Sequence, residues 1–100
     1  MMTLQEAKDM VPIFLEMFEP ERSKKIFRFQ DFIWHYEPTK SEEDLCAILD
    51  DLAVCLDDYV PNPEWRKHCP GHYYGEEKLI ENIKEALQAI EALEIKNKNI

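Results

Sequence analysis

The chain has 100 residues, the size of one domain, and 45% of them are hydrophobic, so it can bury a single core. Only two glycines occur among plentiful helix-forming residues, which favours an all-α fold. A formal net charge of -9 repels phosphate backbones, so we expect no direct binding of nucleic acid.

The first predicted helix begins after Thr3, which fits a capping box with Glu6, and runs to about Phe18. Its apolar residues recur at helical spacing, at Leu4, Ala7, Val11, Phe14, Leu15 and Phe18. Pro12 lies inside this pattern and lacks the N–H that a helix interior uses. We therefore expect a kink or a break near Met10.

The second predicted helix begins at about Glu21 and carries two apolar stripes. One stripe is made by Ile26, Phe29, Ile33 and Tyr36. Phe27 and Trp34 form the other stripe, on a different side of the helix. We favour placing this helix at the centre of the bundle; the alternative leaves Phe27 and Trp34 exposed as an anchor for a partner. Its basic residues are interpreted as a solvated face: Arg22, Lys24, Lys25 and Arg28.

The third predicted helix begins at Ser41, whose hydroxyl can cap it, and ends just beyond Val60, where two prolines follow. Its core stripe is Leu45, Ile48, Leu49, Leu52, Leu56 and Tyr59.

Residues 61–75 are rich in proline and aromatic residues and predict a long ordered loop. A last helix is predicted over residues 76–93, with a tail at 96–100 that frays.

These elements together predict an all-α fold, in the form of an antiparallel four-helix bundle with a long ordered loop between its third and fourth helices. We expect a single domain over residues 1–95. No stretch approaches the roughly 18 apolar residues of a membrane span, and the N-terminus lacks the pattern of a secretion signal. We therefore expect no membrane association and a cytoplasmic location.

The outer face of the third predicted helix carries an unusual pattern of charge. Two sets of acidic residues repeat every seven residues: Glu43, Asp50 and Asp57, and beside them Asp44, Asp51 and Asp58. At about 100° per residue they form two stripes that flank Ala47 and Val54. No basic residue occurs between Ser41 and Val60 to offset their repulsion. We favour a docking face for a basic partner over a face that only keeps the protein in solution.

We predict no enzyme activity, no metal and no cofactor. Adjacent aspartates on a helix point about 100° apart, so they do not converge on one reacting atom. His68, Cys69 and His72 are of the types that bind zinc, but a structural site needs four ligands and no second pair occurs, so we interpret them as part of a turn. Cys46 and Cys55 lie about 13 Å apart along one helix and cannot form a disulfide, which indicates reduced thiols.

Three stretches carry a resemblance to a known family: FQDFIWHYE, LDDLAVCLDDYVPNPEWR and YYGEEKLIENIKEAL. With them the chain resembles the colicin-D-immunity-like family of bacterial self-protection proteins. The resemblance implies a helical bundle that binds and blocks the nuclease domain of a colicin-like or contact-dependent inhibition toxin, expected to be a tRNase. Acidic contact residues of the family match Asp57, Asp58 and Glu64 here. Asn62 departs from the pattern, since an acidic residue is expected just after Pro61.

We predict that the partner is the basic surface of a cognate toxin nuclease domain and that the free protein is a monomer or a weak dimer. The predicted partner-binding residues are Glu43, Asp50, Asp51, Val54, Asp57, Asp58, Tyr59, Asn62, Glu64, Trp65, Tyr73 and Tyr74. The alternative is a cytoplasmic adaptor unrelated to toxins, which would bind its partner through the stripe of Phe27 and Trp34.

Overall fold

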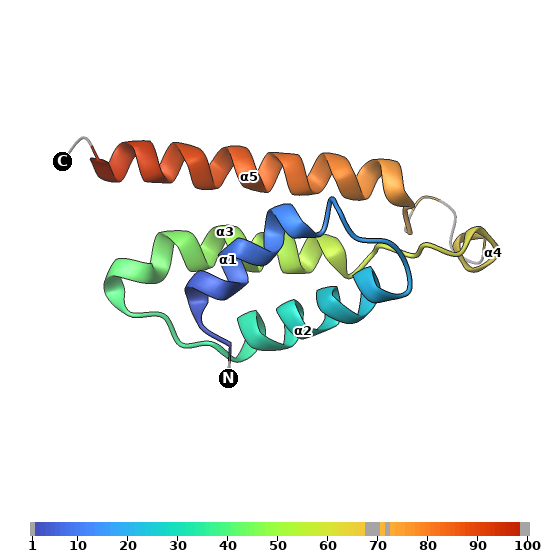
Figure 1. Cartoon of the computed structure of the whole chain (residues 1–100), viewed down its shortest axis with the longest axis horizontal. Coiled ribbons are helices and arrows are strands. Elements are labelled where there is room, and N and C mark those ends of the chain that lie inside the picture. Colours follow the sequence, from blue (N-terminus) through green and yellow to red (C-terminus); the bar gives the residue numbers. More distant parts are fainter. Residues whose placement is uncertain (1, 68–70, 72, 99–100) are drawn as a thin grey trace.

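A computed structural model describes residues 2–67, 71 and 73–98 and is all-α (Figure 1). Its elements are α1 (Leu4–Ile13), α2 (Glu21–His35), the 3₁₀ turn η1 (Lys40–Glu42), α3 (Glu43–Leu56), α4 (Pro63–Arg66) and α5 (Glu76–Lys98). In these residues the β pairing consists of one parallel bridge, between Tyr59 and Tyr74. None of the described helices has both the length and the apolar character that crossing a bilayer requires.

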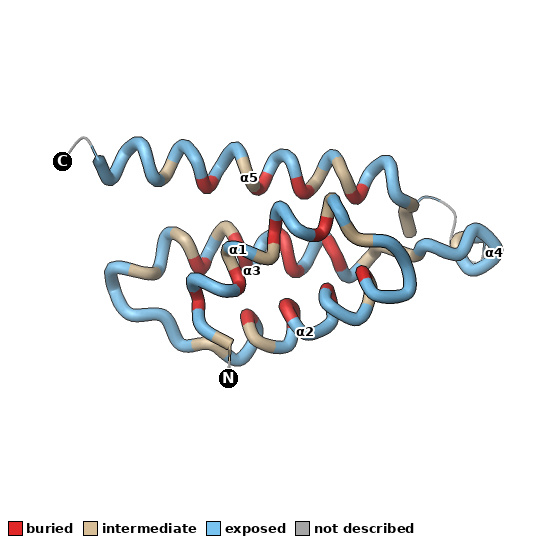
Figure 2. The backbone as a smooth tube through the Cα atoms, in the orientation of Figure 1, coloured by how far each residue is buried: buried red, intermediate tan, exposed pale blue. Residues whose placement is uncertain are grey.

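Helix α3 lies between α2 and α5, and α1 packs against both α2 and α5 (Figure 1). The expectation that α2 is the central helix is therefore wrong. The physical reason is that α2 buries one side only, as the exposed outer side of its tube shows in Figure 2. Phe27 and Trp34, at the flank of that side, are 69% and 47% exposed.

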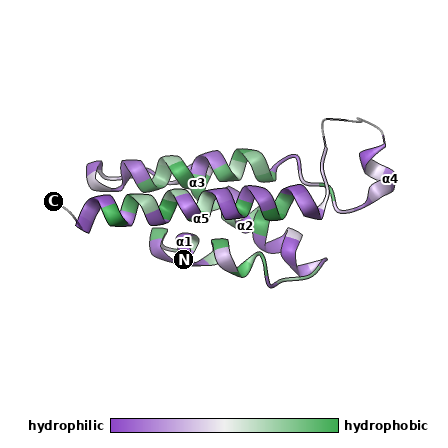
Figure 3. Ribbon diagram, turned by 90° about the horizontal axis from the view of Figure 1, so that it is seen from above, coloured by the Kyte–Doolittle hydropathy of each residue, from purple (hydrophilic) through white to green (hydrophobic). Residues whose placement is uncertain are grey.

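The core is built from the apolar stripes that the sequence displays. The largest fully buried side chains come from α1 and its end, α2, α3 and α5: Val11, Phe14, Phe29, Leu49, Leu79 and Ile83. Phe14 and Phe29 meet edge to face, with ring centroids 5.6 Å apart. Hydrophobic colouring concentrates on α3, whereas hydrophilic residues cover much of α5 (Figure 3).

Helix α1 is shorter than predicted and has no break at Met10. Its start is as expected, because the Thr3 hydroxyl accepts the Glu6 N–H at 3.1 Å. The Phe14 N–H still reaches the Met10 carbonyl at 3.1 Å. The N–H groups of the next two residues donate instead to carbonyls three residues back, which is 3₁₀ geometry. Helix α1 therefore ends at Ile13, not Phe18.

Both ends of α3 differ from the prediction. The segment is capped by Thr39, not Ser41, because Thr39 and Glu42 form a capping box around η1. At the other end α3 stops at Leu56 instead of Val60. Helix α5 in turn continues to Lys98, beyond the expected end at Leu93, with Lys96 and Lys98 in a last turn where the helix dipole favours cations.

Arg22 was expected in a solvated basic face but is buried, with 3% of its surface exposed. Its Nε donates to the Phe14 carbonyl at 2.9 Å, which caps the end of α1. Its Nη1 lies 3.2 Å from Glu76 Oε1 at the start of α5, and its side chain also hydrogen bonds to Tyr59. One guanidinium from α2 therefore joins α1, α5 and the segment after α3.

We predict that Arg22→Met lowers the free energy of unfolding by about 2 kcal/mol, because the buried Phe14 carbonyl loses its donor. Urea denaturation followed by circular dichroism measures the change. Arg28→Met, on the exposed side of the same helix, is the control and should change stability little. Equal effects of the two substitutions would contradict the role assigned to Arg22.

Glu42 is the most heavily bonded carboxylate at the α2–α3 connection. The Thr39 N–H, the Tyr36 hydroxyl and the Thr39 hydroxyl all donate to it, at 2.9 to 3.0 Å. These bonds, led by the one from the Thr39 N–H, hold the pKa of Glu42 below its ordinary value.

A carboxyl group with a lowered pKa stabilises the fold above its unfolded pKa, and this contribution disappears as the pH falls through the folded pKa. We therefore expect Glu42→Gln to destabilise the protein at pH 7 and to reduce the loss of stability between about pH 5 and pH 3. Denaturant titrations across this range test the prediction. Glu37→Gln is the matched control, since Glu37 is exposed and accepts no hydrogen bond from a described residue; it should leave the pH profile unchanged.

Candidate partner-binding surface

The acidic residues predicted as a docking face do line the outer side of α3 and the residues just after it. Glu43, Asp50 and Asp57 form what we call the first acidic row, and Asp44, Asp51 and Asp58 form the second. Asp58 is half-buried and the other five are exposed. None of those five pairs with a cation in the described part of the chain. Val54 lies between the rows, 57% exposed.

The C-terminal end of α3 is an unfavourable place for this charge. Its last turn contains no basic residue, and Asp57 follows directly as the C-cap. Carbonyl groups at a helix C-terminus carry partial negative charge, so a carboxylate there is repelled. The first acidic row therefore extends to a position where a cation would stabilise the helix and a carboxylate destabilises it.

Side chains from outside the helix bind the free carbonyls of this end. Gln30 on α2 donates its Nε2 to the Ala53 carbonyl at 3.0 Å. The Tyr74 hydroxyl donates to the Cys55 carbonyl in a short hydrogen bond. Burial raises the pKa of Tyr74 to about 12, so this hydroxyl keeps its proton.

The bridge between Tyr59 and Tyr74 holds the loop against the end of α3. The Val60 N–H donates to the Tyr74 carbonyl at 2.9 Å, and the Tyr74 N–H donates to the Asp58 carbonyl at 3.0 Å. The Tyr59 hydroxyl donates to Glu19 at 2.8 Å. The ring centroids of Tyr59 and Tyr74 lie 6.2 Å apart. Both tyrosines, predicted as partner contacts, thus already have intramolecular bonds. A direct contact of either with a partner stays a prediction.

Asn62 has a local structural role. Its side-chain oxygen accepts the Glu64 N–H at 2.9 Å and caps the short helix α4. Glu64 itself lies 3.3 Å from Lys67 in an exposed ion pair. Trp65, on the same turn, is 67% exposed and packs on little of the protein.

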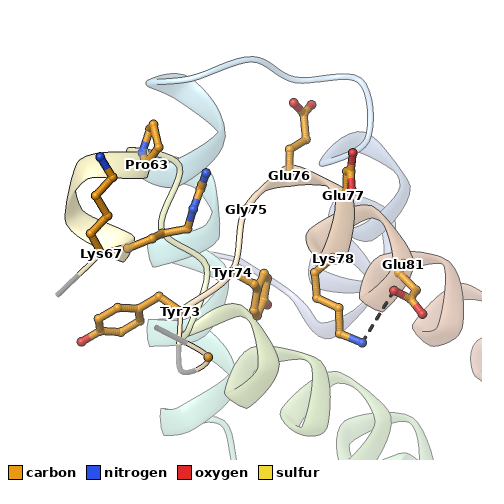
Figure 4. A pocket seen from close by; sticks show the side chains of 11 residues that line it. Pro63, Lys67, Tyr73, Tyr74, Gly75, Glu76, Glu77, Lys78 and Glu81 are labelled. Atoms are coloured by element: carbon orange, nitrogen blue, oxygen red, sulfur yellow. Dashed lines mark ion pairs between the residues drawn. The ribbon is translucent and has the colours of Figure 1, made fainter. Parts of the chain in front are cut away.

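An open groove of about 940 Å³ separates α4 from the start of α5 (Figure 4). Arg66 supports it, since its Nη1 donates to the Val60 carbonyl at 2.8 Å. Gly75 allows this placement, because a Cβ there would lie 2.6 Å from the same nitrogen. The lining mixes Lys67 and Lys78 with glutamates and half-buried Tyr73, so the groove selects no single sign of charge.

The predicted residues therefore occupy two regions. Asp50, Asp51, Val54 and their neighbours share the α3 face, whereas Trp65 and Tyr73 lie in the loop beyond its end. Gln30, which fixes α2 against α3, is a structural residue that was not predicted from the sequence. Its signal was a polar residue inside the apolar stripe of the predicted second helix.

The described residues contain no group of three or more His, Cys, Asp or Glu side chains arranged to hold a metal ion. His68, Cys69 and His72, interpreted as a turn, lie outside the described residues. Cys46 and Cys55 are both free thiols within α3. Burial, with a further contribution from Asp50, raises the pKa of Cys46, which keeps this thiol protonated.

Comparisons by family model, by sequence and by structure match no protein family, no curated protein and no solved structure.

We predict that Asp57→Asn raises the free energy of unfolding by about 0.5 kcal/mol, because it removes a negative charge from the C-terminal end of α3. Chemical denaturation at low ionic strength measures this, and added salt should shrink the gain. Glu91→Gln, within α5, removes one charge away from a helix end and should be close to neutral. A destabilised Asp57→Asn protein would show that the carboxylate has a structural bond.

Proposed function

We propose that this protein is an immunity protein, which binds a cognate bacterial toxin nuclease, expected to be a tRNase, and neutralises it without chemistry of its own. Its four longer helices would act as an antiparallel bundle that holds α3 rigid. The acidic rows of α3 and the loop after it would cover the basic cleft of the toxin.

The observation that carries the proposal is the uncompensated charge around Val54. Like charges at helical-neighbour spacing cost a few tenths of a kcal/mol each, and a solvated helix usually includes cations among them. Here five exposed carboxylates remain without a described cation, and the first row ends at an unfavourable helix end. A positively charged partner surface would offset both costs on binding.

The inhibition would be steric and electrostatic. A nuclease cleft that binds anionic RNA is positively charged, and carboxylates placed where phosphates lie can occupy it. Val54 would supply a small apolar contact at the centre of the interface, with the charged rows at its rim. The same opposite charges would steer the two proteins together and speed association.

A second candidate function is that of an adaptor protein unrelated to toxins. The exposure of Phe27 and Trp34 on α2 favours it, since aromatic side chains in contact with solvent are frequent anchors of protein interfaces. In that case substitutions in the aromatic pair, and not in the acidic rows, should abolish binding of the partner.

The test is calorimetric titration with a colicin-type nuclease domain, beginning with one encoded beside this chain's gene. We expect tight binding that weakens steeply with added salt. The variant Asp50→Asn, Asp51→Asn, Asp57→Asn should lose affinity by roughly 100-fold or more, since truncating interfacial charge commonly costs a few kcal/mol. It should also fail to protect the nuclease's RNA substrate from cleavage.

A control with the same loss of charge is Glu16→Gln, Glu37→Gln, Glu91→Gln, because these exposed residues lie outside α3. It should retain most of the affinity and all of the inhibition. Two outcomes would show that the acidic surface of α3 is not an inhibitory site. In the first, the nuclease domain does not bind the wild-type protein. In the second, both variants bind it as well as the wild type does.

A further inference from the structure

Helix α2 presents an aromatic face that no described element covers. Phe27 and Trp34 lie seven residues apart on it, 69% and 47% exposed. Exposed aromatic side chains are frequent anchors of protein interfaces, so this face is a candidate docking surface. The neighbouring residues on α3 indicate which kind of partner fits it.

The hydrogen bond from Gln30 to the Ala53 carbonyl marks the line along which α2 and α3 touch. On α2, the residues three after and four before Gln30 are Ile33 and Ile26, and both are buried. The residues three before and four after it are Phe27 and Trp34, which point to the outer side.

Helix α3 repeats this pattern around Ala53. Leu56 and Leu49, three after and four before it, are buried in the core. Asp50 and Asp57, three before and four after it, are exposed. The aromatic pair and the first acidic row therefore lie on the same outer side of the α2–α3 contact.

The two pairs are also level with each other. Helices α2 and α3 run in opposite directions (Figure 1), so with Gln30 opposite Ala53 a step forward on α2 matches a step back on α3. Trp34 is then at the height of Asp50, and Phe27 at the height of Asp57. Each exposed ring has a carboxylate beside it on the neighbouring helix.

We propose that this composite surface binds arginine side chains of a partner, one at Trp34 with Asp50 and one at Phe27 with Asp57. A guanidinium is planar and weakly hydrated, so it can stack on an aromatic ring while its edge donates to a carboxylate. A lysine ammonium is a compact, strongly hydrated charge and gains less from the ring. A second copy of this chain suits the surface poorly, because its own acidic row would lie against this one.

This inference rests on the proposed function, since it names the chemistry by which a basic partner would be recognised. It also joins the contact residues of the two candidate functions, because the aromatic pair and the acidic row become parts of one surface. A nuclease that binds here would present arginines about two helical turns apart.

The test uses two helical, alanine-based peptides that differ at two positions seven residues apart, with arginine in one and lysine in the other. The protein carries Trp65→Phe, so Trp34 is its only tryptophan and reports binding by fluorescence. We expect the arginine peptide to bind roughly fivefold to tenfold more tightly than the lysine peptide and to change the Trp34 emission. The double variant Phe27→Leu, Trp34→Leu, followed by NMR, removes both rings and should bind both peptides equally.

Trp65→Leu in the natural chain is the matched control, because Trp65 is at least as exposed but lies on α4. It should keep the preference for arginine. Equal affinity for the two peptides in the wild type, or no binding of either, would overturn this inference, while the nuclease titration judges the acidic surface separately. A change in Trp34 emission with protein concentration alone would show instead that the face is an interface between two copies.

Discussion

The carbonyl end of α3 is the point on which the rest of the molecule depends. This helix ends without a glycine or a cation, and its free carbonyls are bound by Gln30 from α2 and Tyr74 from the loop. The bond from Gln30 sets the register of α2 against α3, and the bond from Tyr74 attaches the loop that leads to α5. Because the free carbonyls are bound by side chains from other elements, the outer side of α3 does not have to supply a cation and can carry negative charge.

That freedom explains how a small domain tolerates a concentrated acidic face. The inner side of α3 is apolar along its whole length and packs against two helices, so the fold does not rely on its outer side. Arg22 adds a buried connection between α1, α2 and α5 that is independent of the acidic rows. The residues that we propose for binding a partner are thus different from those that stabilise the free protein.

Local patterns in the sequence predicted the four longer helices but not most of their ends, because apolar periodicity and the cap at Thr3 act over a few residues. What could not be predicted depends on contacts between elements. Arg22 resembles its exposed neighbours Lys24 and Lys25 in sequence, and it is buried only through contacts with other elements, among them the end of α1 and the start of α5. The acidic rows are readable from their seven-residue spacing, whereas the aromatic pair beside them requires the register that Gln30 sets.

The contact between α1 and α5 has a consequence for how the chain acquires its structure. Lys8 and Glu94 meet at 2.8 Å although 86 residues separate them. Contacts so distant in sequence form late, because a long loop must close before they gain anything. During synthesis, the side of α3 that faces α5 therefore stays open to water until nearly the whole segment has left the ribosome. In that interval the nascent chain displays both an apolar and an acidic face, and chaperones would meet it in that form.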